Sequence, residues 1–181
     1  MNRFFMGIAF VAVLSMSSCI KADPARSTKM FTFISGEKLG HFKESIHLAR
    51  IGGGRDTQPF TKIPRVSNTD LKHAMTKSLE ISNLLAKRDA KYHLTIRLLE
   101  ESVIKCRGAT VVTTNMQYQL LEKNSDDMIY DKQFSVFHVV PFKKAIFGPD
   151  RHRLALEGSV RLNIETFLLD LENVDPEARS E

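Results

Sequence analysis

The residue with the clearest chemistry is Cys19, which ends the stretch Leu14-Ser15-Met16-Ser17-Ser18-Cys19. A positive start at Arg3 and an apolar run over residues 4–14 come before it. This order is typical of a secretory signal. Small residues directly before a cysteine are typical of a lipobox, at which a bacterial export signal is cut and the new N-terminal thiol is acylated. We therefore expect residues 1–18 to be a signal peptide and Cys19 to carry covalent lipid.

An acylated Cys19 would anchor the chain to a membrane, and two or three acyl chains make such anchoring stable. The apolar run before it is shorter than the roughly 20 residues that a membrane-spanning helix needs. Ile20, in place of Asp, favours sorting to the outer membrane in enteric-type bacteria. We expect the protein at the inner leaflet of the outer membrane, facing the periplasm. The alternative is an ordinary secreted protein with a free Cys19.

The second of the two cysteines is Cys106. A Cys19–Cys106 disulfide competes with lipidation, because an oxidising periplasm permits disulfides. If Cys19 is acylated, Cys106 has no partner in the chain. We then expect it to be a structural or incidental thiol, because no base or orienting acid is recognisable beside it.

The remaining residues carry no catalytic or metal-binding motif. The six histidines are scattered, and none belongs to an HExxH motif or to a spaced Cys/His ligand set. No GxSxG nucleophile motif occurs either. We therefore expect a protein that is not an enzyme, with no metal and no cofactor except the lipid on Cys19. The alternative is an envelope enzyme whose dispersed site gathers His93, His138 or His152 with an acid.

A second candidate site is the apolar and basic segment 142–149. Phe142, Ile146 and Phe147 lie there beside Lys143 and Lys144. Clustered apolar side chains on a surface mark a contact with a membrane or a protein. The alternative is that this loop is tucked under the sheet.

The charge of the chain is mildly basic, with 26 Lys and Arg against 21 Asp and Glu, net +5. The basic residues are spread along the chain, and no run of them is dense enough to predict nucleic-acid binding. An anionic surface such as lipid headgroups fits this charge, as does an ordinary solvated surface.

The pattern of apolar residues predicts an α+β domain over residues 42–174. Ser67 and Asp70 are spaced as a capping box for a helix that ends near residue 86. Period-two alternation predicts strands at 45–51, 92–98, 110–121 and 130–140, and a second helix follows over 150–172. The fold expected is a four-stranded, mainly antiparallel sheet with two helices on one face. Residues 19–41 are expected to be the lipidated cysteine and a tether, and residues 175–181 a polar tail.

The element order behind a lipobox resembles small envelope lipoproteins of Gram-negative bacteria. The segments Gly52-Gly53-Gly54, Ser67-Asn68-Thr69-Asp70-Leu71 and Tyr92-His93-Leu94 resemble the auxiliary lipoproteins of ABC-type lipid transport systems. Residues 154–164 resemble the end of many uncharacterised alphaproteobacterial lipoproteins. The lipoprotein that plugs the lipopolysaccharide-assembly barrel shares the same pattern. The likeness covers about residues 42–172.

The resemblance implies an accessory, non-catalytic role and carries over no active-site residue. The expected partners are the membrane, through the lipid anchor, and a protein in an envelope complex that transports or assembles lipid or polysaccharide. The alternative to this role, besides an enzyme, is a structural lipoprotein that binds peptidoglycan.

Overall fold

The computed structural model describes residues 22–58, 63–106 and 108–176. Its sheet has the strand order β1-β2-β3-β4. The strands are β1 (Ile46–Gly52), β2 (Tyr92–Cys106), β3 (Ala109–Glu122) and β4 (Met128–Pro141). β2, β3 and β4 pair antiparallel, whereas β1 pairs parallel with β2. The α+β fold with a mainly antiparallel sheet is therefore confirmed.

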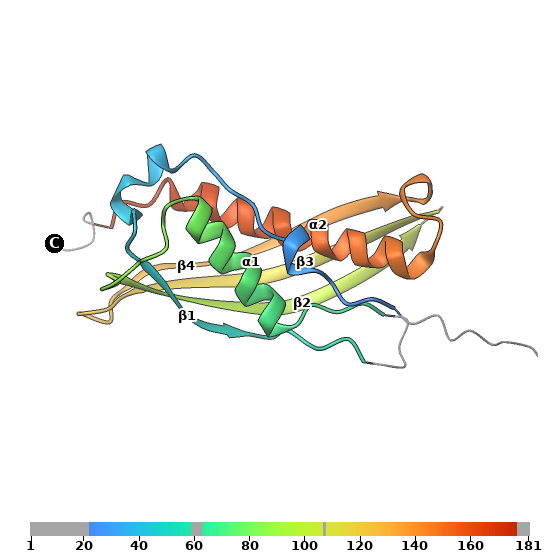
Figure 1. Cartoon of the computed structure of the whole chain (residues 1–181), viewed down its shortest axis with the longest axis horizontal. Coiled ribbons are helices and arrows are strands. Elements are labelled where there is room, and N and C mark those ends of the chain that lie inside the picture. The colour runs from blue at the N-terminus through green and yellow to red at the C-terminus, as the bar shows by residue number, and fades with distance from the viewer. Residues whose placement is uncertain (1–21, 59–62, 107, 177–181) are drawn as a thin grey trace, which may run out of the picture.

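Two helices cover one face of this sheet (Figure 1). α1 (Asn68–Ile81) lies between β1 and β2 in the chain, and α2 (Gly148–Leu171) follows β4. Parallel strands need such a crossover, because a tight turn cannot join them. Short 3₁₀ helices are η1 (Ser27–Lys29), η2 (Gly36–Phe42) and η3 (Phe142–Lys144).

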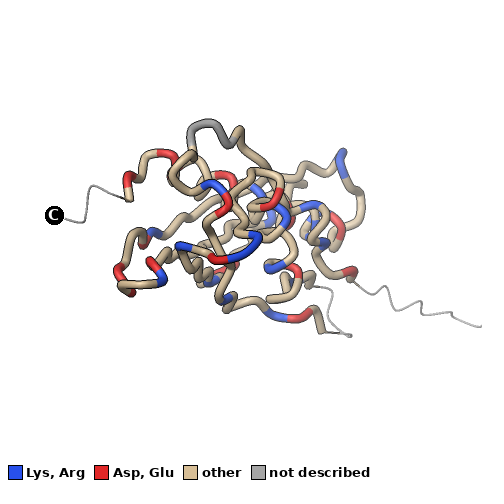
Figure 2. The backbone as a smooth tube through the Cα atoms, turned by 60° about the vertical axis from the view of Figure 1, so that its left-hand side comes forward, with Lys and Arg blue, Asp and Glu red and all other residues tan. Residues whose placement is uncertain are grey.

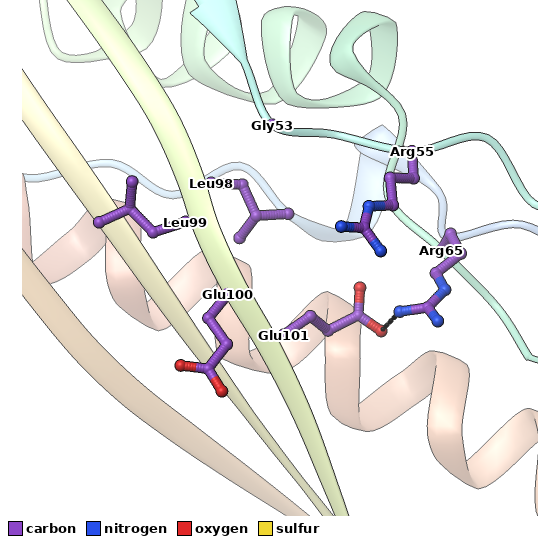
Figure 3. Close-up of a pocket in the computed structure, with 7 residues that line it drawn as sticks. All are labelled: Gly53, Arg55, Arg65, Leu98, Leu99, Glu100 and Glu101. Carbon is purple, nitrogen blue, oxygen red and sulfur yellow. Dashed lines mark hydrogen bonds and ion pairs between the residues drawn. The ribbon is translucent and has the colours of Figure 1, made fainter.

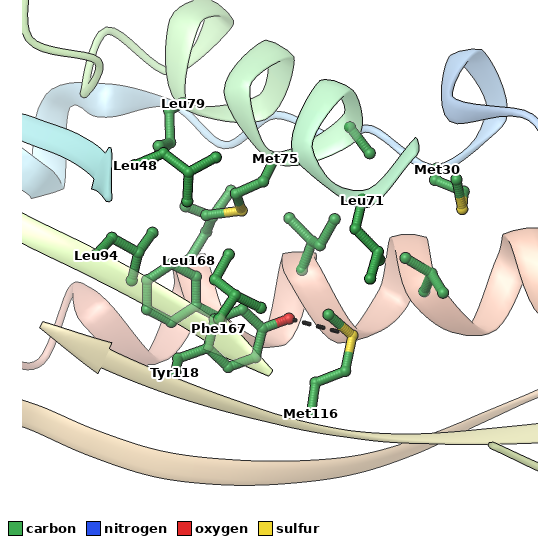
Figure 4. Packing of buried hydrophobic residues seen from close by; sticks show 14 of the residues in the cluster. Met30, Leu48, Leu71, Met75, Leu79, Leu94, Met116, Tyr118, Phe167 and Leu168 are labelled. Atoms are coloured by element: carbon green, nitrogen blue, oxygen red, sulfur yellow. Dashed lines mark hydrogen bonds between the residues drawn. The ribbon is translucent and has the colours of Figure 1, made fainter. Parts of the chain in front are cut away.

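The core lies between the helices and the inner face of the sheet. Alternate residues of β3 are buried as predicted, and Tyr118 stacks on Phe167 of α2 with ring centroids 4.3 Å apart. Figure 4 shows side chains of α1, among them Leu71, Met75 and Leu79, meeting this pair and Leu168. Burying each large apolar side chain contributes about 1.5–3 kcal/mol, so this single layer between helices and sheet holds the elements together.

Two predicted boundaries are wrong. The first helix ends at Ile81 and not near residue 86, because Asn83 takes a positive φ of 57° and turns the chain back toward β1. β2 continues to Cys106 beyond the predicted end at residue 98, because it pairs with β3 along its whole length. The capping box is confirmed: the Asp70 amide donates to the Ser67 hydroxyl at 3.1 Å.

The segment 22–41 is not a tether. Ala25, Met30, Ile34 and Leu39 are buried in the common core. The Thr32 amide also donates to the Ser78 hydroxyl of α1 at 3.1 Å. The buried apolar side chains of this segment pack into the core, so the folded domain already includes Ala22, which is 2% exposed.

The charges are distributed as the sequence predicts. Figure 2 shows basic and acidic positions interspersed over the described chain.

Candidate functional site

The geometry of the chain limits how far Cys19 can lie from the domain. Cys19 itself lies outside the described residues, as does the predicted signal peptide. Ala22 is the third residue after Cys19 and is buried. Three residues span at most roughly 11 Å. Any group attached to Cys19 is therefore held close to the end of the domain at which Ala22 lies.

The predicted contact loop is exposed and lies at that same end. Figure 1 shows the loop between β4 and α2 and the start of the described chain at one end of the long axis, with residue 176 at the other. Phe142, Ile146 and Phe147 are 51%, 77% and 40% exposed. The loop is therefore not tucked under the sheet, which was the alternative.

Arg151, a residue that sequence reasoning missed, holds this loop in place. Its Nη1 donates to the carbonyl oxygens of Ala145 at 2.7 Å and Ile146 at 2.5 Å. Its guanidinium also lies 5.0 Å from the centre of the Phe142 ring, in a cation–π contact. These contacts tie the loop to the first turn of α2, so the three apolar side chains are displayed by a braced loop.

The outer face of the sheet carries a second apolar surface near this end. Ile104, Val111 and Val139 lie side by side on β2, β3 and β4, because Val111 pairs with both of the others. Phe137, paired with Thr113, extends the surface along β4. Ile104, Phe137 and Val139 are exposed. We call these four residues the outer apolar patch.

The three histidines of the enzyme alternative lie in different environments. His93 packs against His47 of β1, with ring centroids 5.7 Å apart. His138 lies against Gly158 of α2. His152 is buried, with its Nε2 3.6 Å from the Glu101 carboxylate. These three environments are separate. The enzyme alternative asks for one of these histidines together with an acid, and His152 beside Glu101 is the pair of that kind.

A cavity of about 230 Å³ lies beside Glu101, between the loop that precedes α1 and strand β2. Figure 3 shows Arg55 and Arg65 reaching over it, with Arg65 bound to Glu101 at 3.2 Å. Arginine and carboxylate charges balance in its lining, and no nucleophile is among the lining residues. The arrangement is therefore suited to fastening the loop to β2 and α2.

A second ionic cluster fastens the N-terminal segment to α2. The Arg26 amide donates to Oε1 of buried Glu157 at 2.9 Å, and Arg153 approaches the same oxygen at 3.5 Å. One carboxylate therefore accepts from two arginines of different segments.

A second cavity, of about 300 Å³, lies between η1, β4, η3 and α2. Its basic lining residues are Lys29, His138, Lys144 and Arg161. Burial lowers the pKa of His138, and the positive charges of Arg161 and Lys144 lower it further. The basic residues of this lining outnumber its one acidic residue, Glu157.

Neither a metal site nor a membrane span is found in the described ranges. No group of three or more His, Cys, Asp or Glu side chains there is placed to hold a metal ion. No helix within 22–58, 63–106 and 108–176 has the length and apolar character to cross a membrane. Cys106 is an exposed free thiol at the end of β2.

The comparisons with known proteins place the chain by fold. No family model matches the sequence, and no curated protein is significantly similar to it. A crystal structure from Xanthomonas campestris, of a protein in the family DUF330, matches with a TM-score of 0.52 and 12% identity over 73% of this chain and 88% of that one. A candidate lipoprotein from Caulobacter crescentus matches with a TM-score of 0.50 and 11% identity over 72% of this chain and 89% of that one.

The chain shares their fold. At this identity the likeness extends to the fold alone, which agrees with the architecture described above.

Proposed function

We propose that this chain is a lipid-anchored accessory protein of the bacterial cell envelope, without enzymatic activity of its own. Its anchor is lipid on Cys19, and its site is the inner leaflet of the outer membrane, facing the periplasm. It supports a complex that transports or assembles lipid or polysaccharide. The observation that carries this proposal is the burial of Ala22 at the end of the domain that displays Phe142, Ile146 and Phe147.

The short link from Cys19 to Ala22 brings this end of the domain against the membrane surface. Apolar groups at an interface insert about 5–10 Å into the boundary between headgroups and acyl chains. Phe142, Ile146 and Phe147 suit this depth, because they are exposed at the tip of a braced loop. Lys143 and Lys144 in the same loop are exposed and attract anionic headgroups.

A protein partner accounts best for the outer apolar patch. Strands rise about 3.3 Å per residue, so Phe137 is set back from the end of β4 at Pro141 by roughly 13 Å along the strand. That is deeper than interfacial insertion reaches. A flat apolar surface beside a membrane anchor suits an integral envelope protein that stands next to it. The fold shared with a candidate lipoprotein, and the sequence resemblance to transport auxiliary lipoproteins, support this role.

The anchor is tested by Cys19→Ser in the native host. The wild-type protein should sediment with membranes, and its N-terminal peptide should carry acyl mass. The variant should lose both, because the thiol is the acylation site. A variant that still sediments with membranes and keeps the wild-type N-terminal mass would contradict the proposal.

The accessory role is tested by affinity purification from membranes solubilised in several mild detergents. The wild-type protein should bring down a permease, a substrate-binding partner or an outer-membrane barrel. Phe137→Asp should lose this partner, because it places a charge in the outer apolar patch. The control is Leu169→Asp, at an exposed apolar residue near the far end of α2. Recovery of the lipoprotein alone under every condition would contradict an accessory role.

A further inference from the structure

The cavity between η1, β4, η3 and α2 has the composition of a site for an amphipathic anion. Lys29, Lys144 and Arg161 line it from three different elements. None of the three makes an ion pair with another described residue in the contacts of the structure. Unpaired cations that converge on one cavity suit a phosphate group, which accepts several charge-assisted hydrogen bonds.

The acidic residue of the lining does not cancel this positive charge. Glu157 is 2% exposed, and its Oε1 accepts from Arg26 and lies 3.5 Å from Nη1 of Arg153. Its charge is therefore balanced by two arginines that do not line the cavity. The lowered pKa of His138 agrees with an excess of positive charge there, in addition to the effect of burial.

The rest of the lining is apolar. Besides Gly158, it consists of Val140 and Leu154, on the side of the sheet that faces α2, and of Val139 and Pro141, whose side chains alternate to the outer face. A free inorganic anion gains nothing from such walls, whereas a glycerol backbone and the first methylene groups of an acyl chain bury apolar surface against them. The volume of about 300 Å³ is at the lower end of the range for small-molecule sites.

The cavity also adjoins the loop that we place on the membrane. Lys144 is a lining residue and lies two positions from both Phe142 and Ile146. A phospholipid that leaves the bilayer beside this loop therefore meets the cavity next.

We propose that Lys29, Lys144 and Arg161 bind the phosphate group of a membrane phospholipid, whose glycerol region packs on Val140 and Leu154. This proposal deepens the proposed function and rests on its orientation at the membrane. The phospholipid is a bound ligand in addition to the covalent lipid on Cys19.

The test measures binding by the full-length protein, purified from membranes in a neutral detergent. The probes are short-chain phosphatidylglycerol, the corresponding diacylglycerol without phosphate, and inorganic phosphate. Phosphatidylglycerol should bind, diacylglycerol should not, and inorganic phosphate should bind at least about tenfold more weakly, because it lacks the apolar contacts. Equal binding of inorganic phosphate, or equal binding of diacylglycerol, would overturn the proposal.

Two variants and a matched control locate the site. Lys144→Gln and Arg161→Gln should each weaken phosphatidylglycerol binding about tenfold, because each removes a charge-assisted contact. Both residues are exposed, so neither change should affect folding. Lys143→Gln removes the same charge from the neighbouring residue, which does not line the cavity, and should change the affinity less than twofold. Equal losses in all three variants, or no loss in any of them, would overturn the proposal.

The mass of the N-terminal peptide in the same preparations separates this inference from the proposed function. Absence of acyl mass on Cys19 would contradict the anchor. If the anchor is normal but Lys144→Gln and Arg161→Gln leave the affinity for phosphatidylglycerol unchanged, only the phospholipid site is contradicted.

Discussion

Gly158 is the residue that brings α2 nearest to the sheet. A Cβ at this position would lie 2.6 Å from Cγ of His138, closer than real side-chain contacts allow, and it would also meet Cδ2 of the same ring. Glycine inside a helix costs about 1 kcal/mol relative to alanine. In return for this cost, glycine at position 158 makes the close contact between α2 and β4 possible.

Gly158→Ala should lower the free energy of unfolding by about 1 kcal/mol. The gain in helix propensity is about 1 kcal/mol, and the clash with the half-buried His138 ring costs about 1–3 kcal/mol. In a His138→Ala background the same change should instead stabilise, because the ring is absent. Urea denaturation of the wild type, both single variants and the double variant measures this coupling. An increase in the free energy of unfolding on Gly158→Ala in the wild-type background would contradict a clash with the His138 ring.

Asn163 shows how far sequence reasoning reaches at the scale of a residue. It lies three residues after Val160 and four before Phe167, a helical spacing that puts it on the buried side of α2, and it is fully buried. Its partners could not be predicted: it accepts from the Tyr118 hydroxyl at 3.0 Å and donates to the Thr114 and Phe134 carbonyls, each at 3.0 Å. Periodicity identifies which side of a helix is buried, but it carries no information on the register between α2 and two strands.

Among the elements, the end of α2 is tied to β4 through Asp170. Its Oδ2 accepts from the Tyr130 hydroxyl and from Lys132 Nζ, each at 2.7 Å. Burial alone would raise the pKa of Asp170, but the hydrogen bonds from Lys132 and Tyr130 outweigh it and hold the pKa below its ordinary value. The ionised carboxylate therefore stabilises the folded state.

Asp170→Asn should cost about 1 kcal/mol of stability at pH 7, because it removes a charge from two hydrogen bonds at a partly exposed site. The unfolded carboxyl titrates near pH 3.9 and the folded one below that. The contribution is therefore complete above about pH 4, and it is lost as the pH falls through the folded pKa. Urea denaturation at pH values from 7 to 3 measures this. The difference in the free energy of unfolding between wild type and variant should become smaller only below about pH 4.

Glu165→Gln is the control for this prediction, because Glu165 lies on the same helix and makes no hydrogen bond or ion pair with the described residues. It should change the stability little at pH 7. A gap between wild type and Asp170→Asn that stayed constant down to pH 3 would contradict the role of the carboxylate.

The elements differ in how well the sequence predicts them. Period-two alternation predicted the middle of each strand, since inner and outer residues differ there in polarity. It missed residues 99–106 of β2, because both faces of this strand are largely exposed here and alternation disappears. It also missed the packing of residues 22–41, where Met30, Ile34 and Leu39 are spaced too irregularly for a strand or an α-helix.

At the scale of the whole molecule, three features that are far apart in the chain lie together at one end. They are Ala22, the loop with Phe142, Ile146 and Phe147, and the turn between β2 and β3 at Gly108. A Cβ on Gly108 would lie 3.6 Å from Cβ of Phe142, so the turn and the loop are neighbours. The sequence predicted the composition of the loop. It could not predict this meeting, which depends on the lengths of β2, β3 and β4.

Cys106, beside that turn, is a natural probe of how this end meets the membrane. It is the one cysteine besides Cys19, so in the acylated protein a thiol-reactive fluorophore should label it alone. We expect a label on Cys106 to be shielded from an aqueous quencher when the lipid-anchored protein is reconstituted in vesicles. Replacing Phe142, Ile146 and Phe147 together by serine should increase the quenching at least about twofold, because three side chains worth up to about 1.5–3 kcal/mol each no longer insert. The anchor should still hold this variant in the vesicle fraction.

The control is Leu169→Ser, at the far end of α2, which should leave the quenching of the Cys106 label unchanged. Equal quenching in the wild type and the loop variant would show that the domain does not stand on this end, even if Cys19 is acylated.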